Sequence, residues 1–183
     1  MLYLSLDIDR TLVHACPTRF VKPEWLTHFK SFIYEEYTVF VRPYLQEFLT
    51  YLETIQDKVK IGLFTAGSIH YKNFIIEELF EDKVKLDFTF SANDYDNAFD
   101  LYGTRKPMQY VANKLNTDVK NILMVDDSNA IFRDNSIFAN NFYLISKFVV
   151  CDDFKHNFFD QILQDRALLD LIQWVQVKID FVV

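Results

Sequence analysis

The chain has 183 residues, of which 50% are hydrophobic and 25% are charged, so it can bury a full core and has an ordinary globular composition. Its formal net charge of −7 argues against a broad basic face for nucleic acid or for an anionic membrane. We therefore expect one domain over residues 1–183 and neither of these two partners.

The first half of the chain predicts alternating strands and helices. The N-terminal run is rich in Met and Leu, which indicates a buried strand. Apolar residues recur at the helical period after Pro43, and Ser68 is a typical cap for a second helix. The expected elements are strand 2–8, a loop-like region 15–38 with a short helix, helix 42–55, strand 59–67 and helix 68–80.

The second half continues the alternation. Near-continuous apolar strands that alternate with helices are typical of a parallel sheet with helices on both faces. We expect the amphipathic helix at the end of the chain to pack on this sheet. The expected elements are strand 85–91, a polar, turn-rich segment 92–104, helix 105–115, strand 121–128, strand 140–146 and helix 154–180.

Two acidic side chains, two residues apart, stand at the end of the first predicted strand. Asp7 and Asp9 would point to one side, where two like charges are unfavourable unless a cation or a shared proton lies between them. A helix cap and a loop carboxylate would explain the pair without any ligand. Thr65 and the pair Asp126-Asp127 end two other predicted strands. Ligands bind where the carboxyl ends of parallel strands meet, so we expect a site at this edge.

Four motifs in this order resemble those of the haloacid dehalogenase-like (HAD) superfamily: D-x-D-x-T at 7–11, Thr65, Lys106 and the pair Asp126-Asp127. The stretches DIDRTLVH, VFVRPYLQEFL, LFTAG and VDDS narrow the resemblance to the RNA-polymerase-tail (CTD) phosphatases, the FCP/SCP-like or NLI-interacting-factor-like branch. The resemblance covers residues 1–147. It implies a three-layer α/β/α Rossmann-like fold with a central parallel sheet and a minimal cap insertion at 15–38.

The resemblance also implies a reaction. Asp7 would attack phosphorus and form an aspartyl-phosphate, and Asp9 would act first as general acid and then as general base. The carboxylates of Asp7 and Asp127 and the main-chain oxygen of Asp9 would hold one Mg²⁺, which takes oxygen ligands and substrate phosphate together. This ion would make the paired charges tolerable.

Other matched residues would bind the phosphoryl group. Thr65 and the backbone N–H groups of Ala66 and Gly67 would hydrogen-bond its non-bridging oxygens. Lys106 would add a fixed positive charge. Asp126 would support the metal shell or orient Lys106.

Several residues near the motifs have structural alternatives. Thr11 either contacts phosphate or caps a turn. His14 matches the family pattern but is typically a packed, hydrogen-bonded residue, and Arg42 is equally explained by a structural ion pair. Ser128 is expected to begin a helix. The aromatic residues of the insertion either line the site entrance or pack in the core; they are Trp25, Phe29, Phe32, Tyr34 and Tyr37.

Departures from the branch leave the substrate open. Arg10 stands where CTD phosphatases often carry an acid or a small residue, and the segment after Thr65 lacks an Asp-Pro stretch. The stretch TRKPMQYVANKL is closer to small-molecule HAD phosphatases. We expect a Mg²⁺-dependent phosphomonoester hydrolase that acts on a phosphoprotein or a small phosphomonoester. The alternatives are a phosphotransferase, a nucleic-acid 3′-phosphatase, which the charge disfavours, and a non-catalytic HAD-fold binding module, which should have lost a motif carboxylate.

The sequence also suggests a compartment. Cys16 and Cys151 form no close-spaced metal or redox motif, and nothing makes them a disulfide framework. Asp7 interrupts the N-terminal apolar run too early for a signal peptide, and no window holds 18 uncharged apolar residues. These features predict a reduced, cytoplasmic protein without a transmembrane helix.

Overall fold

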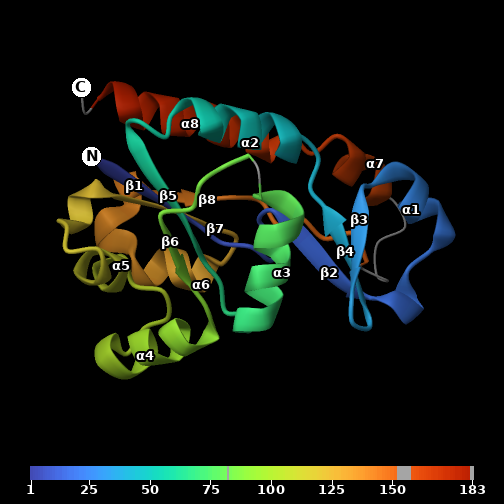
Figure 1. Cartoon of the computed structure of the whole chain (residues 1–183), viewed down its shortest axis with the longest axis horizontal. Coiled ribbons are helices and arrows are strands. Elements are labelled where there is room, and N and C mark those ends of the chain that lie inside the picture. Colours follow the sequence, from blue (N-terminus) through green and yellow to red (C-terminus); the bar gives the residue numbers. More distant parts are fainter. Residues whose placement is uncertain (82, 152–157, 182–183) are drawn as a thin grey trace.

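Five parallel strands form the main sheet of the computed structural model, which describes residues 1–81, 83–151 and 158–181. Their order is β6-β5-β1-β7-β8, so β1, which Asp7 follows, lies in the middle (Figure 1). All five predicted strands are present, each shorter than predicted. The strands are β1 (Leu2–Leu6), β5 (Val59–Phe64), β6 (Phe88–Phe90), β7 (Ile122–Asp126) and β8 (Phe142–Leu144).

Helices cover both faces of this sheet, which confirms the predicted three layers (Figure 1). Successive residues of β7 point to opposite faces, so Leu123 and Val125 join one core while Ile122 and Met124 join the other. The first core packs against α2 (Leu45–Thr54), α3 (Ile69–Leu79) and α8 (Ala167–Asp180). The second core packs against α4 (Ala92–Tyr102), α5 (Met108–Lys114) and α6 (Asn129–Asp134).

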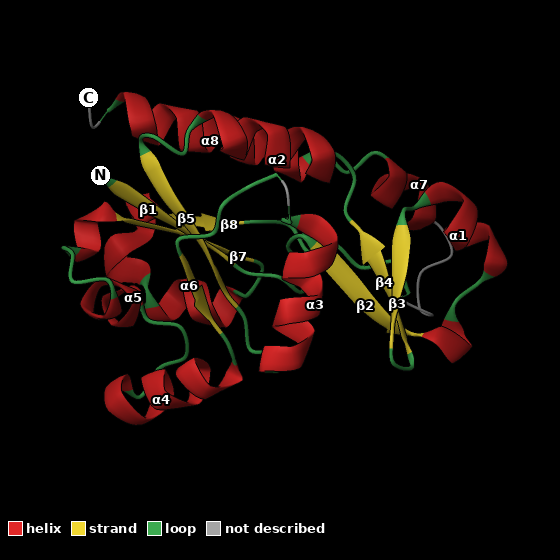
Figure 2. Cartoon of the chain, viewed as in Figure 1, coloured by secondary structure: helices red, strands yellow, loops and turns green. Residues whose placement is uncertain are grey.

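A second, antiparallel sheet occupies the region that the sequence predicted as mainly loop. Its order is β2-β4-β3, and it lies at the end of the molecule away from the N-terminus (Figure 2). The expected short helix is present as α1. Trp25 and Phe29 stack edge-on against Phe40 and are buried, so these two side chains pack in a core of their own. The elements are β2 (Val13–Pro17), α1 (Pro23–His28), β3 (Ser31–Tyr34) and β4 (Tyr37–Val41).

Two predictions about helices need correction. The segment predicted to be turn-rich is helix α4, which begins with a reciprocal capping box between Ser91 and Asp94 and ends at Gly103 in the left-handed conformation. The single helix predicted over 154–180 is two helices, α7 (Phe158–Leu163) and α8, and its residues 154–157 lie outside the described residues. The break follows from Asp165, whose carboxylate accepts the Ala167 N–H at 2.9 Å.

Short 3₁₀ turns complete the chain: η1 (Thr18–Phe20), η2 (Val119–Asn121) and η3 (Ser136–Asn141). Within the described ranges, no helix is both long and apolar enough to cross a bilayer.

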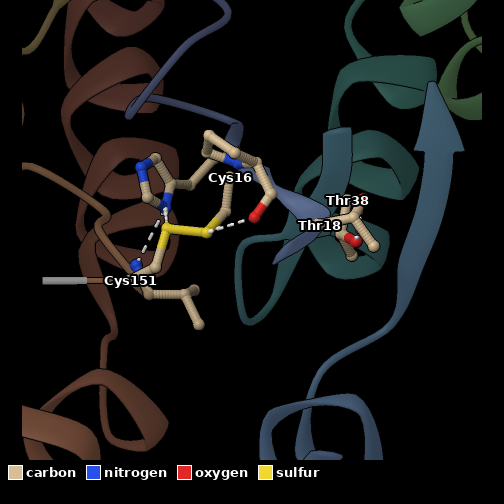
Figure 3. Close-up of a disulfide and its surroundings, with 7 residues drawn as sticks. Cys16, Thr18, Thr38 and Cys151 are labelled. Carbon is tan, nitrogen blue, oxygen red and sulfur yellow. Dashed lines mark hydrogen bonds between the residues drawn. A yellow bond between two sulfur atoms is a disulfide. The ribbon is translucent and has the colours of Figure 1, made fainter. Parts of the chain in front are cut away.

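The two cysteines are joined, which corrects the expectation that nothing pairs them. Cys16 lies on β2 and Cys151 lies beyond β8, and their Cα atoms are 6.3 Å apart (Figure 3). A separation of 135 residues gives no local signal, because only the tertiary fold brings the two together. The pairing removes the argument from the cysteines for a reduced compartment.

Reduction of this disulfide should destabilise the fold. A cross-link that closes so long a loop restricts the unfolded chain, and its loss should cost about 3–5 kcal/mol of unfolding free energy. For a chain of this size, that corresponds to a melting temperature lower by roughly 6–20 °C. Thermal melts with and without dithiothreitol measure the shift. A Cys16→Ser, Cys151→Ser double variant is the control, because dithiothreitol should not lower its melting temperature further; a wild-type melt that ignores the reductant contradicts the pairing.

Candidate active site

A cavity of about 430 Å³ lies at the carboxyl ends of β1, β5 and β7. Thr11 and Gly67 do not line the cavity, but each hydrogen-bonds a residue that does. The edge at which the sequence predicted a ligand site is therefore hollow. The predicted site residues that line the cavity are Asp7, Asp9, Thr65, Ala66, Lys106, Asp126 and Asp127.

Asp7 is buried and held from two sides. One carboxylate oxygen, Oδ1, accepts from the Lys106 ammonium, and the other, Oδ2, accepts from the Thr11 hydroxyl at 2.9 Å. Burial raises the pKa of Asp7 to about 7; the positive Lys106 opposes this shift and the negative Asp126 adds to it. The Thr11 hydroxyl thus helps to orient the Asp7 carboxylate.

Lys106 links Asp7 to Asp126. Its Nζ also donates to Asp126 Oδ2 at 2.8 Å, and its side chain is buried. Burial lowers the pKa of Lys106, but the two carboxylates more than offset this effect and raise the pKa above its usual value. The lysine is therefore a fixed cation in the cavity. Asn135, which the sequence gave no reason to select, donates to the Lys106 carbonyl at 3.2 Å and accepts from the Met108 N–H at 2.7 Å.

Three carboxylates form a group with the chemistry of a divalent metal site. Ligand oxygens of Asp7, Asp126 and Asp127 lie within 4.8 Å of one another. Hard cations such as Mg²⁺ prefer oxygen ligands of this kind, so the residues fit the ion. Asp126 already accepts from Lys106 and from the Ser128 N–H at 2.9 Å, which suits a supporting role better than a ligand role. Burial and the negative charge of Asp126 raise the pKa of Asp127. The positive charges of Lys147, Arg10 and Lys106 oppose this shift.

Asp9 has a partner that sequence reasoning missed. The Tyr71 hydroxyl donates to Asp9 Oδ1 at 2.8 Å. Burial raises the pKa of Asp9, and the Tyr71 hydrogen bond opposes that shift. The Tyr71 ring packs against Tyr34 of the small sheet, with centroids 5.2 Å apart. A Cβ at Gly67 would lie 2.8 Å from this ring, so the glycine makes room for it.

The turn after β5 holds one of the two amides predicted to bind phosphate in a hydrogen bond within the chain. The Gly67 N–H donates to Thr65 Oγ1 at 2.9 Å, so this amide is engaged within the chain. Thr65 accepts that bond and keeps its own hydroxyl proton to donate. The expected contacts of Ala66 and Gly67 with phosphate stay predictions. Ser68 caps α3 as predicted, because its hydroxyl accepts the Tyr71 N–H at 3.2 Å.

The contacts of Arg42 indicate a role in holding the fold together. It is buried, forms an ion pair with Asp165, and donates to the carbonyls of Thr11 at 2.9 Å and Ser146 at 2.7 Å. The structural ion pair that the sequence left open is therefore present. Ser128 begins α6 as predicted, and its hydroxyl accepts the Ile131 N–H at 3.4 Å.

The segment 145–151 is attached to the loop that follows Asp9 and to β2. The Phe148 N–H donates to the Arg10 carbonyl at 2.8 Å, and the Val150 N–H donates to His14 Nδ1 at 3.0 Å. The disulfide follows one residue later (Figure 3). His14 is thus a packed, hydrogen-bonded residue at the cavity wall, and burial together with Arg10 lowers its pKa to about 4.

Comparison with known sequences gives two matches. A model of the family described as NLI interacting factor-like phosphatase matches residues 2–181. A CTD phosphatase-like protein of Invertebrate iridescent virus 3 is 31% identical over 139 residues, which cover 68% of this chain and 73% of that protein.

Solved structures share the fold. A variant of the fission yeast RNA polymerase II CTD phosphatase Fcp1, bound to beryllium fluoride, matches 94% of this chain with a TM-score of 0.54 and 19% identity. This chain spans 50% of that Fcp1 chain. A HAD family enzyme from Bacteroides thetaiotaomicron, in complex with magnesium and inorganic phosphate, matches 86% of this chain and 99% of its own, with a TM-score of 0.53 and 12% identity. At these identities the likeness concerns the fold, and it confirms the predicted HAD-like architecture.

Proposed function

We propose that this chain, which belongs to the NLI interacting factor-like phosphatase family, is a Mg²⁺-dependent phosphomonoester hydrolase that acts on a phosphoprotein through an aspartyl-phosphate. The main observation that supports this proposal is the environment of Asp7. Its two carboxylate oxygens are held by Lys106 and Thr11, in a cavity where Asp126 and Asp127 lie beside it. A buried carboxylate oriented in this way can attack phosphorus when cations relieve the repulsion between the two anions.

In the first step, a carboxylate oxygen of Asp7 forms a bond to phosphorus while the bond from phosphorus to the substrate oxygen breaks. Asp9 gives its proton to that leaving oxygen. Lys106 and the Thr65 hydroxyl donate to the non-bridging oxygens, where they stabilise the charge of the transition state. When bound, Mg²⁺ would be held by Asp7, Asp127 and the main-chain oxygen of Asp9, and it would neutralise charge on the phosphoryl group.

In the second step, Asp9 takes a proton from water, and the water oxygen attacks phosphorus. The bond between phosphorus and Asp7 breaks, which releases inorganic phosphate and restores the carboxylate. The raised pKa of Asp9 suits both roles, because the group can hold a proton in the first step and accept one in the second.

The surroundings of the cavity support a phosphoprotein as substrate. Among the described residues of the insertion 15–38, only Ala15 lines the cavity, and Trp25 and Phe29 are buried elsewhere. The insertion therefore leaves the cavity accessible to a phosphorylated side chain on a large molecule. The viral relative described as CTD phosphatase-like supports the same substrate class.

The substrate class is testable with the purified chain. We expect phosphopeptides to be hydrolysed with kcat/KM at least roughly 10-fold above sugar phosphates and nucleotides, a difference within the reach of a few substrate contacts. Release of inorganic phosphate with Mg²⁺ present measures all three classes in parallel. Turnover confined to sugar phosphates or nucleotides would overturn the phosphoprotein proposal in favour of a metabolite phosphatase. Failure to hydrolyse even p-nitrophenyl phosphate would favour a non-catalytic module.

Tyr71→Phe should lower activity, because it removes the hydroxyl that holds the Asp9 carboxylate in position. Loss of one hydrogen bond should reduce kcat roughly 3- to 10-fold. That hydrogen bond lowers the pKa of Asp9, so its loss should also move the corresponding limb of the pH–rate profile to higher pH. Tyr51→Phe is the matched control, because it removes a hydroxyl that bonds Gln176 far along the chain. If Tyr71→Phe lowers only the melting temperature and leaves the pH profile in place, the tyrosine is merely structural.

A further inference from the structure

Two exposed arginines line the cavity in addition to the residues of the proposed reaction. Arg10 follows the acids of the first motif, and Arg105 directly precedes Lys106. We call this pair the arginine rim. Neither forms an ion pair within 4.0 Å in the part of the chain that the structure describes. Both guanidinium groups are therefore available to an anion from outside.

Arg105 is held in place by aromatic rings of α4. Its guanidinium carbon lies 5.5 Å from the centre of the Tyr95 ring and 5.6 Å from that of Phe99. Tyr95 itself lines the cavity. Stacking on aromatic faces leaves the edge of a guanidinium free to donate to a carboxylate or a phosphate. Because the stack reduces the freedom of the side chain, less entropy is lost when an anion binds.

Arg10 occupies a backbone conformation that few side chains adopt. Its φ is 62°, in the left-handed region, where a residue with a Cβ is disfavoured. Arg10 lines the same cavity as Asp9 and Asp127, and its positive charge lowers the pKa values of both groups against the effect of burial. The backbone is fixed there by the Phe148 N–H, which donates to the Arg10 carbonyl.

The arginine rim contrasts with the charge of the whole chain. The net charge is −7, which repels an anionic substrate at long range. Apart from Asp7, Asp9, Asp126 and Asp127, which serve the proposed reaction, no acidic residue of the described chain lines the cavity. Among the lining residues that take no part in the proposed reaction, the charged side chains are those of Arg10 and Arg105, and both are positive.

We propose that the arginine rim binds a second anionic group that flanks the phosphorylated residue of a peptide, an acidic side chain or another phosphate. This inference rests on the proposed phosphoprotein substrate and names its class. Lys106 and Thr65 bind the phosphoryl group that is removed, while Arg10 and Arg105 bind a neighbouring anion through charge-assisted hydrogen bonds. Peptides with neutral flanks lose these contacts.

The test compares matched phosphopeptides that carry one phosphoserine and differ only in having Glu or Gln at the flanking positions. The readout is the ratio of kcat/KM for the two peptides, in which any general effect on the chemistry cancels. We expect the wild type to favour the Glu peptide on the order of 10-fold at low salt. Arg10→Gln and Arg105→Gln should each reduce the ratio roughly two- to five-fold, the size of an exposed ion pair. A third peptide with a second phosphoserine distinguishes phosphate from carboxylate as the preferred group.

Arg19→Gln is the matched control. Arg19 also stacks on an aromatic ring, that of Phe20 at 4.8 Å, but it does not line the cavity. It changes the net charge equally and should leave the ratio unchanged. The wild-type preference should also decline between about 0.1 M and about 1 M salt, as the Debye length falls from about 10 Å to about 3 Å.

The outcomes separate this inference from the proposed function. Equal hydrolysis of the Glu and Gln peptides by the wild type overturns the arginine rim and leaves the phosphoprotein phosphatase intact. A preference that survives Arg10→Gln and Arg105→Gln, or that Arg19→Gln reduces equally, also overturns it. If neither peptide is hydrolysed while p-nitrophenyl phosphate is, the phosphoprotein substrate is wrong and the arginine rim is rejected with it.

Discussion

Asp7→Asn is expected to abolish hydrolysis of every phosphomonoester, with a loss on the order of 10⁶-fold, as for removal of a covalent nucleophile in another hydrolase. The amide oxygen carries no negative charge and cannot form the bond to phosphorus. The variant keeps the shape of the side chain, so Thr11 and Lys106 retain a neighbour of the same size. The loss should therefore appear in turnover and exceed any effect on folding.

Two measurements make this prediction specific. Incubation with labelled phosphoryl donor should label the wild type at Asp7, and the variant should carry no label. Asp134→Asn is the control, because it neutralises an exposed carboxylate at the end of α6, outside the cavity. Label found on Asp9 instead would reverse the roles of the two acids, and substantial turnover by Asp7→Asn would exclude a covalent mechanism through this residue.

Removal of divalent metal should also abolish activity. Excess EDTA is expected to stop hydrolysis of p-nitrophenyl phosphate, and added Mg²⁺ should restore it, because without the cation the carboxylate and the phosphate repel each other. The carboxylates of Asp7 and Asp127, which cluster with Asp126 within 4.8 Å, would supply ligand atoms for the cation. The cation would also lower the raised pKa of Asp7 and keep this group charged.

Asp127→Asn distinguishes a metal site from a general effect of the chelator. The variant should need a higher Mg²⁺ concentration for half-maximal rate, since one of few carboxylate ligands is lost. Asp118→Asn is the control, because Asp118 is exposed, pairs with Lys120 of the same turn and does not line the cavity. Full activity after exhaustive chelation would contradict the metal assignment.

The main sheet and its strand ends could be predicted because their signals are local. A strand buried on both faces is apolar along its length, and the first polar residue beyond it marks its end. Asp7, Thr65 and Asp126 stand at such ends, so the rule that ligands bind at the carboxyl ends of parallel strands predicts that these residues lie together. The family resemblance added the roles of these residues.

The small sheet and the supporting residues could not be predicted in this way. The strands β2, β3 and β4 are four or five residues long, and their pairing depends on contacts with the rest of the fold. Tyr71 hydrogen-bonds Asp9 and Asn135 hydrogen-bonds the Lys106 carbonyl, in each case from another part of the chain. No spacing in the sequence indicates these contacts. Helix α4 is different, because Ser91, Asp94 and Gly103 gave start and stop signals that the polar composition outweighed.

The attachment of residues 145–151 to the loop after Asp9 and to β2 makes the wall of the cavity depend on residues that are synthesised long after the first motif. His14 and Val150 are separated by 136 residues, and contacts of such range form late because the chain must first be closed into a long loop. A nascent chain that ends before residue 145 would contain Asp7, Asp9 and the strand that carries them. It would lack the hydrogen bonds that Phe148 and Val150 donate to Arg10 and His14. During synthesis, these two hydrogen bonds can therefore form only after residue 150 has been added, and a shorter ribosome-bound fragment carries the first motif without them.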